Sequence, residues 1–217
     1  MSTFISFEGC EGTGKTTQVN SLKNNLLKHN YSVEIVYDPG TTLLGEYLRD
    51  WLKLENRPPS TPISDLLLFA AARSSLVTEV IQPALKQPNT IIISDRFIDS
   101  TIAYQSYGDG LPLKLVQEIT RISCQNLIPS LTFILDSDPS VSLSRIASIS
   151  NKRTTRKNEK GKERYEKRSI EFHNKVRSGY LEIARTEPNR IHVLDATKPS
   201  NILSDTILEI VLAHLNL

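Results

Sequence analysis

Short apolar runs alternate along this chain with longer segments in which apolar residues recur every three or four positions. Because they are only a few residues long, the short runs predict buried strands. They lie at Phe4–Glu8, Ser32–Tyr37, Thr90–Ser94, Leu131–Asp136 and Arg190–Leu194. Strands separated by helices are typical of a parallel sheet that carries helices on both faces. The pattern therefore predicts an α/β fold with a five-stranded parallel sheet, and ligands at the carboxyl ends of its strands.

Helical periodicity fills the gaps between these strands. After the first strand we expect a helix over Thr17–His29. A longer helix has Thr61 as its N-cap and Pro62 in its first turn, and runs towards Ile81. The remaining helices are predicted near Leu44–Leu52 and at Leu113–Cys124, Pro139–Ile149, Glu163–Arg185 and Asn201–Leu215.

Length and composition are those of an ordinary globular domain. A chain of 217 residues with 39% hydrophobic and 23% charged residues can form one sizeable core, so we expect a single domain over residues 1–217. No apolar run reaches the roughly 18 residues of a membrane helix, and the first strand leaves no room for a signal peptide. Two cysteines, Cys10 and Cys124, are too few for a disulfide framework. These features favour a cytoplasmic setting without a membrane partner.

The net charge of +2 hides an uneven distribution. The segment Asn151–Arg168 carries nine Lys/Arg against three Glu, so it is +6 and the rest of the chain is −4. Within it, Asn151–Lys162 has no apolar residue and is expected to be mobile. Such a basic segment is either an arm that contacts nucleic acid or a lid, at about residues 150–165, that closes over nucleotide phosphates.

A phosphate-binding loop is the most specific motif in the chain. The segment Gly9-Cys10-Glu11-Gly12-Thr13-Gly14-Lys15-Thr16 matches G-x-x-x-x-G-K-[ST] at every fixed position, between a predicted strand and a predicted helix. Backbone N–H groups of such a loop hold phosphates, so we predict ATP binding from Gly9 through Thr17. Lys15 would reach the β- and γ-phosphates, and the Thr16 hydroxyl would ligate Mg²⁺. A dinucleotide-binding fingerprint fits badly, because no third glycine follows.

Charged residues also follow the third predicted strand, where Asp95 and Arg96 come directly after Ser94. A carboxylate at this strand end would hold Mg²⁺ beside Thr16. Arg96 could grip a phosphate with two parallel hydrogen bonds. A capping aspartate and a surface arginine are the alternative interpretation of this pair. The segment Ser100–Gln105 then brings small hydroxyls and a tyrosine near Arg96.

Several motifs together resemble the bacterial type of the thymidylate kinase family, one of the P-loop nucleoside monophosphate kinases. Phe7–Thr17 is close to the family's F-E-G-x-E-G-x-G-K-T-T, and Phe69–Arg73 is similar to its F-x-A-x-R helix. Asp95–Gln105 resembles D-R-Y-x-x-S-x-x-A-Y-Q. Shorter matches, in the family's order, lie at Asp38–Thr41, Leu43–Arg49, Glu163–Glu166 and Asp195–Ala196. The resemblance covers essentially the whole chain.

The resemblance implies ATP as the phosphoryl donor, dTMP as the acceptor, Mg²⁺ as the metal, and ADP and dTDP as products. It implies that Glu11 accepts a hydrogen bond from the sugar 3′-hydroxyl, that Phe69 stacks on thymine and that Tyr104 crowds the 2′ position. Arg73 would donate to a thymine carbonyl, whereas Arg49 and Arg96 would hold the acceptor phosphate. The complete set of dTMP-binding residues that it implies is Glu11, Asp38, Arg49, Phe69, Arg73, Arg96, Ser100, Thr101, Tyr104 and Gln105.

The same resemblance places a catalytic arginine in the lid, because no variable position of the glycine loop is basic. Arg164 is the best match, with Arg153 and Arg156 as rivals, and Arg153 is also predicted to bind ATP. The predicted catalytic residues are therefore Lys15, Arg96 and Arg164. A homodimer is implied by the resemblance alone, and no nucleic-acid partner is expected.

Alternatives stay open at this point. Phe69 could be plain core, and Arg49 and Arg73 could be solvated charges on helix faces. The chain could also phosphorylate another nucleotide or a nucleoside. A nucleotide-dependent switch that binds nucleic acid ranks lower, since the interleaved pattern leaves no separate recognition domain.

Four positions depart from the family's pattern. Tyr37 stands where the family has arginine, and Asp38 where it has glutamate. Thr41 directly follows Gly40, where a second glycine is usual, and Phe97 lacks the expected tyrosine hydroxyl. Three of these departures concern the loop around Asp38, and all four leave the fold and the reaction class unchanged.

Overall fold

The computed structural model describes residues 2–54, 57–153 and 164–216; at 149–153, 164 and 166 it describes only the backbone. As predicted, five parallel strands form one sheet. Their order in the sheet is β2-β3-β1-β4-β5. The strands are β1 (Thr3–Glu8), β2 (Ser32–Tyr37), β3 (Thr90–Asp95), β4 (Leu131–Asp136) and β5 (Ile191–Asp195). The predicted ends differ from these by at most one residue.

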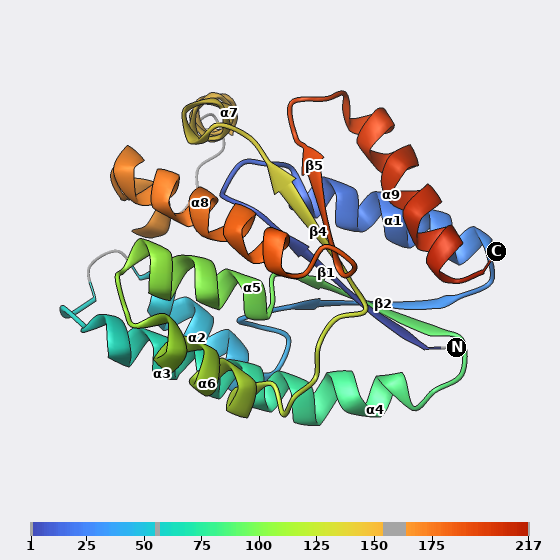
Figure 1. Cartoon of the computed structure of the whole chain (residues 1–217), viewed down its shortest axis with the longest axis horizontal. Coiled ribbons are helices and arrows are strands. Elements are labelled where there is room, and N and C mark those ends of the chain that lie inside the picture. The colour runs from blue at the N-terminus through green and yellow to red at the C-terminus, as the bar shows by residue number, and fades with distance from the viewer. Residues whose placement is uncertain (1, 55–56, 154–163, 217) are drawn as a thin grey trace.

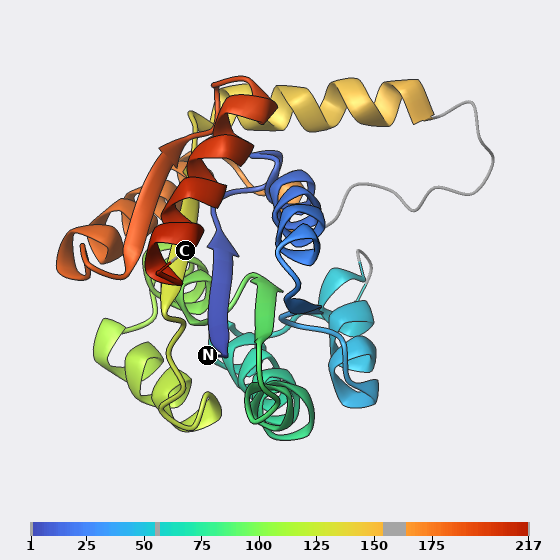
Figure 2. The same cartoon turned by 90° about the vertical axis from the view of Figure 1, so that its right-hand side faces the viewer.

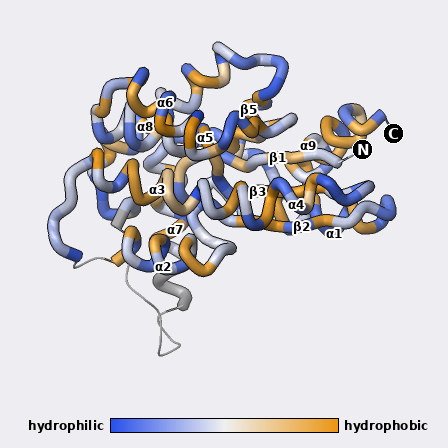
Figure 3. The backbone as a smooth tube through the Cα atoms, turned by 90° about the horizontal axis from the view of Figure 1, so that it is seen from below, coloured by the Kyte–Doolittle hydropathy of each residue, from blue (hydrophilic) through white to orange (hydrophobic). Residues whose placement is uncertain are grey.

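Helices cover both faces of the sheet because the central strands bury alternate residues on opposite sides. On one face, Ile91 and Ile93 of β3 pack with α1 (Lys15–Lys28) and α9 (Ser200–His214). On the other face, Ile92 packs with α3 (Pro62–Leu76). Figure 1 shows α1 and α9 on one side of the sheet and α3 on the other. Figure 3 shows hydrophobic, orange-coloured backbone near the label of β3. Because helices cover both faces of β3, this strand is apolar on both of its sides.

The predicted long helix after Thr61 is continuous, but its geometry changes along its length. The Thr61 hydroxyl accepts a hydrogen bond from the Ser64 N–H and caps α3, as predicted. After Leu76 the chain passes through a π-helical segment, η1 (Val77–Ile81), into α4 (Gln82–Leu85). The other helices are α2 (Leu43–Lys53), α5 (Ile98–Thr101), η2 (Ile102–Gly108, π-helical), α6 (Leu113–Ser123) and α7 (Pro139–Arg153).

The prediction of one helix over Glu163–Arg185 is wrong. A short 3₁₀ helix, η3 (Arg164–Lys167), comes first, and α8 (Ile170–Thr186) begins only after Ser169. The Ser169 hydroxyl accepts from the Phe172 N–H, so it starts a new helix. Ser169, a residue type that favours the N-cap position, was the sequence signal for a helix start within this segment.

Two helices, α7 and α8, lie near the carboxyl ends of the strands. Helix α8 is tied to the end of β4, because Arg177 donates two 2.8 Å hydrogen bonds to the Asp136 carboxylate. Helix α7 extends away from the sheet (Figure 2). Within the described ranges, no helix combines the length and the apolarity that a membrane span requires.

Candidate functional site

The glycine loop, residues 9–17, leaves the carboxyl end of β1 and enters the first turn of α1. Gly9 and Gly12 have φ angles of +128° and +76°, which side chains other than glycine rarely adopt. A Cβ atom at Gly9 would lie 2.4 Å from the Leu135 carbonyl oxygen, and one at Gly12 would lie 2.3 Å from the Ser142 carbonyl oxygen. Backbone from β4 and α7 therefore leaves no room for a side chain at either glycine.

This loop contains nine of the residues predicted to bind ATP, namely Gly9, Cys10, Glu11, Gly12, Thr13, Gly14, Lys15, Thr16 and Thr17. The Lys15 ammonium group folds back and donates to the carbonyls of Gly9 (3.0 Å) and Cys10 (2.8 Å). Burial, and next the positive charge of Arg96, lower the pKa of Lys15 to about 8. A phosphate would favour the charged form of this lysine.

Thr16 and Asp95 meet as the metal prediction requires. The Thr16 hydroxyl donates to Oδ2 of Asp95 over 3.0 Å, which joins the first turn of α1 to the end of β3. A hydroxyl and a carboxylate are hard oxygen ligands, which suit Mg²⁺. No cluster of three or more His, Cys, Asp or Glu side chains suited to a metal occurs in the part of the chain that the structure describes. Mg²⁺ needs no such cluster, since it is commonly held by one or two carboxylates together with substrate phosphates.

Arg96 lies between the glycine loop and the neighbouring pocket. Its φ angle of +71° is unusual for a non-glycine residue, and its N–H bonds to the Phe7 carbonyl at 2.9 Å. The guanidinium group donates to five oxygen atoms within 3.3 Å, on Gly9, Glu11, Ser100, Tyr104 and Tyr180. Strained backbone of this kind persists where surrounding contacts fix it, and it is common at functional sites.

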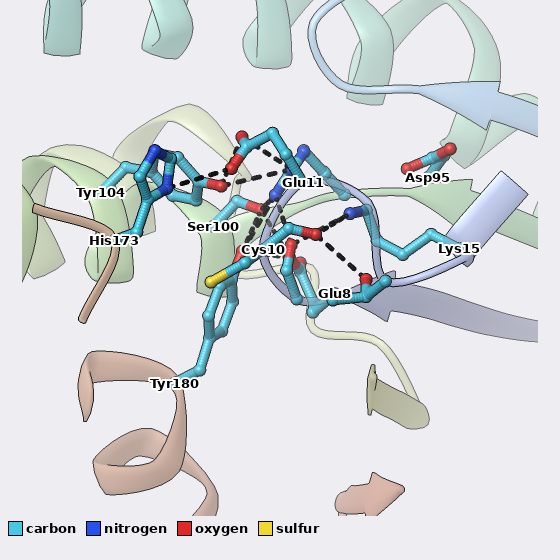
Figure 4. A network of polar contacts seen from close by, with 12 residues as sticks. Glu8, Cys10, Glu11, Lys15, Asp95, Ser100, Tyr104, His173 and Tyr180 are labelled. Atoms are coloured by element: carbon cyan, nitrogen blue, oxygen red, sulfur yellow. Dashed lines mark hydrogen bonds and ion pairs between the residues drawn. The ribbon is translucent and has the colours of Figure 1, made fainter. Parts of the chain in front are cut away.

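Glu11 shares this network, which Figure 4 shows from close by. Its Oε1 atom accepts from the Tyr104 hydroxyl at 2.6 Å and from Arg96 at 3.2 Å. Burial opposes ionisation of Glu11, but the charges of Arg96 and Lys15 and the bond from Tyr104 together lower its pKa. Glu11 is therefore a carboxylate and can accept a hydrogen bond from a ligand hydroxyl.

Glu8 is linked to Arg96 through two hydroxyl groups, those of Ser100 and Tyr180. This fully buried carboxyl accepts from the Phe97 N–H (2.8 Å), the Ser100 hydroxyl (2.5 Å) and the Tyr180 hydroxyl (3.2 Å). Burial, and next the negative charge of Asp99, raise the pKa of Glu8 to about 7. The hydroxyls that bind Glu8 also accept from Arg96, so this cluster fixes the guanidinium group.

A pocket lies beside the glycine loop, and we call it the acceptor pocket; its empty space, with the open solvent at its mouth included, is about 720 Å³. All ten of the predicted dTMP-binding residues line it, namely Glu11, Asp38, Arg49, Phe69, Arg73, Arg96, Ser100, Thr101, Tyr104 and Gln105. Pro39, Leu52, Lys53 and Tyr165 complete the wall. The structure thus brings together residues from five separate segments, while their roles in binding stay predictions.

Aromatic rings form one wall of the acceptor pocket. Phe69 on α3 is half-buried rather than part of the core, and its ring centre lies 6.4 Å from that of Tyr165 in η3. Tyr165 also meets Tyr104 edge to face at 5.5 Å. Sequence reasoning missed Tyr165, because it lies in the lid motif, which indicates phosphate contacts rather than a ring beside a base.

Arg73 and Asp38 form a buried ion pair at the same pocket. Arg73 Nε donates to Asp38 Oδ2 over 2.6 Å, and both side chains are at most 2% exposed. Burial raises the pKa of Asp38 even though the charge of Arg73 opposes that rise. Arg73 also donates to the Thr101 hydroxyl at 2.5 Å. The interpretation of Arg73 as a solvated surface charge is therefore wrong.

Arg49 is not a solvated charge on a helix face either, because its Nη1 donates to the Pro39 carbonyl at 2.7 Å. Its guanidinium carbon lies 5.8 Å from the centre of the Tyr37 ring, within cation–π range. Tyr37, which replaces the family's arginine, thus contacts a residue predicted to hold the acceptor phosphate.

Unpaired polar atoms gather on the wall of the acceptor pocket. Glu11 Oε2, Asp38 Oδ1, Arg73 Nη1 and Gln105 Nε2 are buried and have no hydrogen-bond partner among the described residues. Buried polar atoms without partners cost roughly 1–3 kcal/mol each. Four of them around one pocket indicate that a polar ligand supplies the missing partners.

The side chains of Arg164 and Arg153 and the whole of Arg156 lie outside the described residues, as does most of the expected mobile stretch Asn151–Lys162.

Tyr180 and His173 on α8 are further site residues that sequence reasoning missed. Tyr180 lies 84 positions from Arg96, which it contacts at 3.1 Å. No local motif could have found either residue.

Comparison with known proteins agrees with this geometry. The family model described as thymidylate kinase matches residues 7–207. A thymidylate kinase of Chlorobaculum tepidum is 44% identical over 199 residues, covering 91% of this chain and 92% of its own length. One of Pelobacter propionicus is 40% identical, with coverage of 99% and 95%.

A solved structure gives the same result for the fold. The crystal structure of thymidylate kinase from Ehrlichia chaffeensis superposes with a TM-score of 0.74 at 32% sequence identity, covering 97% of this chain and 98% of that one. The predicted α/β fold of the nucleoside monophosphate kinases is confirmed. With the family model matching nearly the whole chain, this protein belongs to the thymidylate kinase family and is a kinase.

Proposed function

We propose that the chain transfers the γ-phosphoryl group of ATP to dTMP, with the glycine loop on the donor and the acceptor pocket on the nucleoside monophosphate. The observation that carries this proposal is the convergence of unpaired polar atoms on one pocket, with Arg96 between that pocket and the loop. A phosphate held by Arg96 would lie next to the phosphates of the loop, as in-line transfer requires.

On the donor side, Lys15 exchanges its two carbonyl partners for phosphate oxygens. The N–H groups of the loop and of the first turn of α1 point at the same phosphates. Thr16 and Asp95 would hold Mg²⁺, which when bound would neutralise negative charge on the phosphates of the donor. A lid arginine, with Arg164 as the leading candidate and Arg153 or Arg156 as rivals, adds positive charge on the transferred group.

On the acceptor side, the phosphate needs no strong base, because its second pKa near 6 leaves it mostly dianionic at pH 7. Arg96 and Arg49 orient this phosphate towards the donor. Arg73 and Phe69 select the base, since Arg73 has a free Nη1 donor for a carbonyl where cytosine presents an amino group. Stacking of thymine on Phe69 would contribute about 1–3 kcal/mol. Glu11 and Tyr104 face the sugar, and Ser100, Thr101 and Gln105 complete the pocket.

The test is an assay of ADP release with five acceptors: dTMP, dUMP, dCMP, AMP and thymidine. The proposal predicts the highest kcat/KM for dTMP and negligible turnover of AMP and thymidine. Preference for AMP would assign a different acceptor to the pocket. Turnover of thymidine above dTMP would mean that Arg96 does not receive a phosphate.

We also propose a homodimer in a cytoplasmic setting. Support for the dimer comes from exposed apolar side chains on α2, α3 and α6, where α3 packs against both other helices. Tyr47, Leu67 and Ile122 are 69%, 52% and 61% exposed, and apolar patches of this kind mark protein interfaces. Sedimentation analysis of the wild type and of Leu67→Asp tests it, with a dimer expected for the wild type and a monomer for the variant.

A further inference from the structure

His173 lies beside the candidate site, but neither the packing of the fold nor the proposed reaction gives this residue a role. It lies in the first turn of α8, one residue after Phe172, and its side chain is only 1% exposed. Both ring nitrogens are buried and have no hydrogen-bond partner in the described parts of the chain. An imidazole in a core normally has at least one such partner, so its two free nitrogens require an explanation.

Across the site, the His173 imidazole faces an unpaired oxygen of Glu11. Nδ1 of His173 lies 3.6 Å from Glu11 Oε2, and Oε2 itself has no partner among the residues described. Figure 4 shows the imidazole facing this carboxylate from the side opposite Lys15. A donor and an acceptor, both buried and both unpaired, therefore face each other at slightly more than hydrogen-bonding distance.

We propose that His173 is a positioning residue, whose Nδ1–H donates to Glu11 Oε2 and fixes the carboxylate that receives the acceptor's 3′-hydroxyl. The inference rests on the proposed function, because it concerns how Glu11 meets the acceptor sugar. Only the tautomer with the proton on Nδ1 can make this bond while the ring is neutral.

The lone pairs of Glu11 allow this arrangement. A carboxylate offers about four acceptor sites, two on each oxygen. Tyr104 and Arg96 occupy Oε1, and His173 would take one site on Oε2. One site is then left for a ligand hydroxyl. Three protein donors on one carboxylate would hold its orientation before the acceptor arrives, which is what precise placement of a sugar requires.

The first test compares two substitutions in steady-state kinetics. His173→Phe keeps an aromatic ring but removes the donor, whereas His173→Asn places an amide N–H close to the position of Nδ1. We expect His173→Phe to raise the KM for dTMP about 5- to 20-fold, which is less than the full loss of a hydrogen bond to a charged group, because His173 acts on the sugar only through Glu11. The KM for ATP should change less than about twofold, and His173→Asn should recover most of the loss.

The acceptor lacking the 3′-hydroxyl separates positioning from packing. With 3′-deoxy-dTMP, wild type and His173→Phe should differ less than about twofold, because the contact that His173 supports is then missing. An equal loss with both acceptors, or an equal rise in both KM values, would overturn the proposal. Failure of the wild type to phosphorylate dTMP would instead refute the proposed function.

A spectroscopic test does not depend on turnover or on the variants folding well. The chain has four histidines, and ¹⁵N-labelled imidazoles report which ring nitrogen carries the proton. We expect His173 to be the Nδ1–H tautomer and its signal to shift in Glu11→Gln. An Nε2–H tautomer that is insensitive to Glu11→Gln would overturn the proposal.

Discussion

The glycine loop and the acceptor pocket meet at Arg96, but they are built in opposite ways. The loop is one contiguous segment, and its lysine is held by carbonyls of the same loop. The pocket is assembled from residues far apart in sequence, and it keeps several polar atoms unpaired. The loop must therefore release Lys15 before it grips a phosphate, whereas the pocket already presents its donors and acceptors. We conclude that the acceptor pocket is already arranged for its ligand, whereas the glycine loop rearranges when it binds the phosphates of the donor.

Removing Arg96 should have the largest effect, since Arg96 contacts both regions. In Arg96→Ala we expect kcat/KM for dTMP to fall about 10³-fold, because a positioned donor to a transferring phosphoryl group has that order of effect. ATP affinity, measured by calorimetry, should change less than about threefold. The matched control is Arg96→Lys, which keeps the charge but not the two-pronged geometry.

A loss of ATP binding equal to the loss of dTMP turnover would contradict this comparison. It would mean that Arg96 organises the glycine loop rather than the acceptor phosphate.

The second prediction concerns the buried Arg73–Asp38 pair. Arg73→Met should destabilise the fold by about 3–5 kcal/mol, because it leaves a buried carboxylate unpaired. The double variant Arg73→Met/Asp38→Asn should recover most of that stability in thermal unfolding. Both variants should keep an elevated KM for dTMP, on the order of tenfold above the wild type, since neither has the Arg73 guanidinium group that donates to the base.

Recovery of the KM in the double variant would contradict the account. Arg73 would then serve only to neutralise Asp38 and would have no role in selecting thymine.

The third and smallest effect is proton uptake by the glycine loop. Because the pKa of Lys15 is lowered to about 8, most of this side chain is neutral at pH 8.5. Phosphate oxygens favour the charged form and raise that pKa again, so ATP binding should take up about 0.5–0.8 proton at this pH. Calorimetry in buffers of different ionisation enthalpy measures the uptake. Lys15→Arg is the control, because arginine stays charged and should show almost no uptake.

Uptake of the same size in Lys15→Arg would assign the proton to another group. The prediction would also be wrong if the wild type took up no proton at pH 8.5.

The two regions also differ in how far the sequence predicted them. The glycine loop was readable because its glycines, lysine and threonine have a fixed spacing between a strand and a helix. The buried environment of Arg73 was not readable, since its partner Asp38 lies 35 positions away. The family resemblance named the pocket residues, but the contacts of Tyr180 and His173 depend on how α8 packs. Local patterns predict elements and contiguous motifs, whereas long-range packing decides which side chains are buried together.

The difference between the prepared pocket and the adjusting loop is tested most directly by calorimetric titration with dTMP. The titration is run once with the ligand-free protein and once with the protein saturated with Mg²⁺ and a non-hydrolysable ATP analogue. Our account predicts dissociation constants for dTMP that agree within about threefold, since the pocket's donors and acceptors are in place without the donor nucleotide. Binding of dTMP that becomes measurable only after the analogue is added would contradict it.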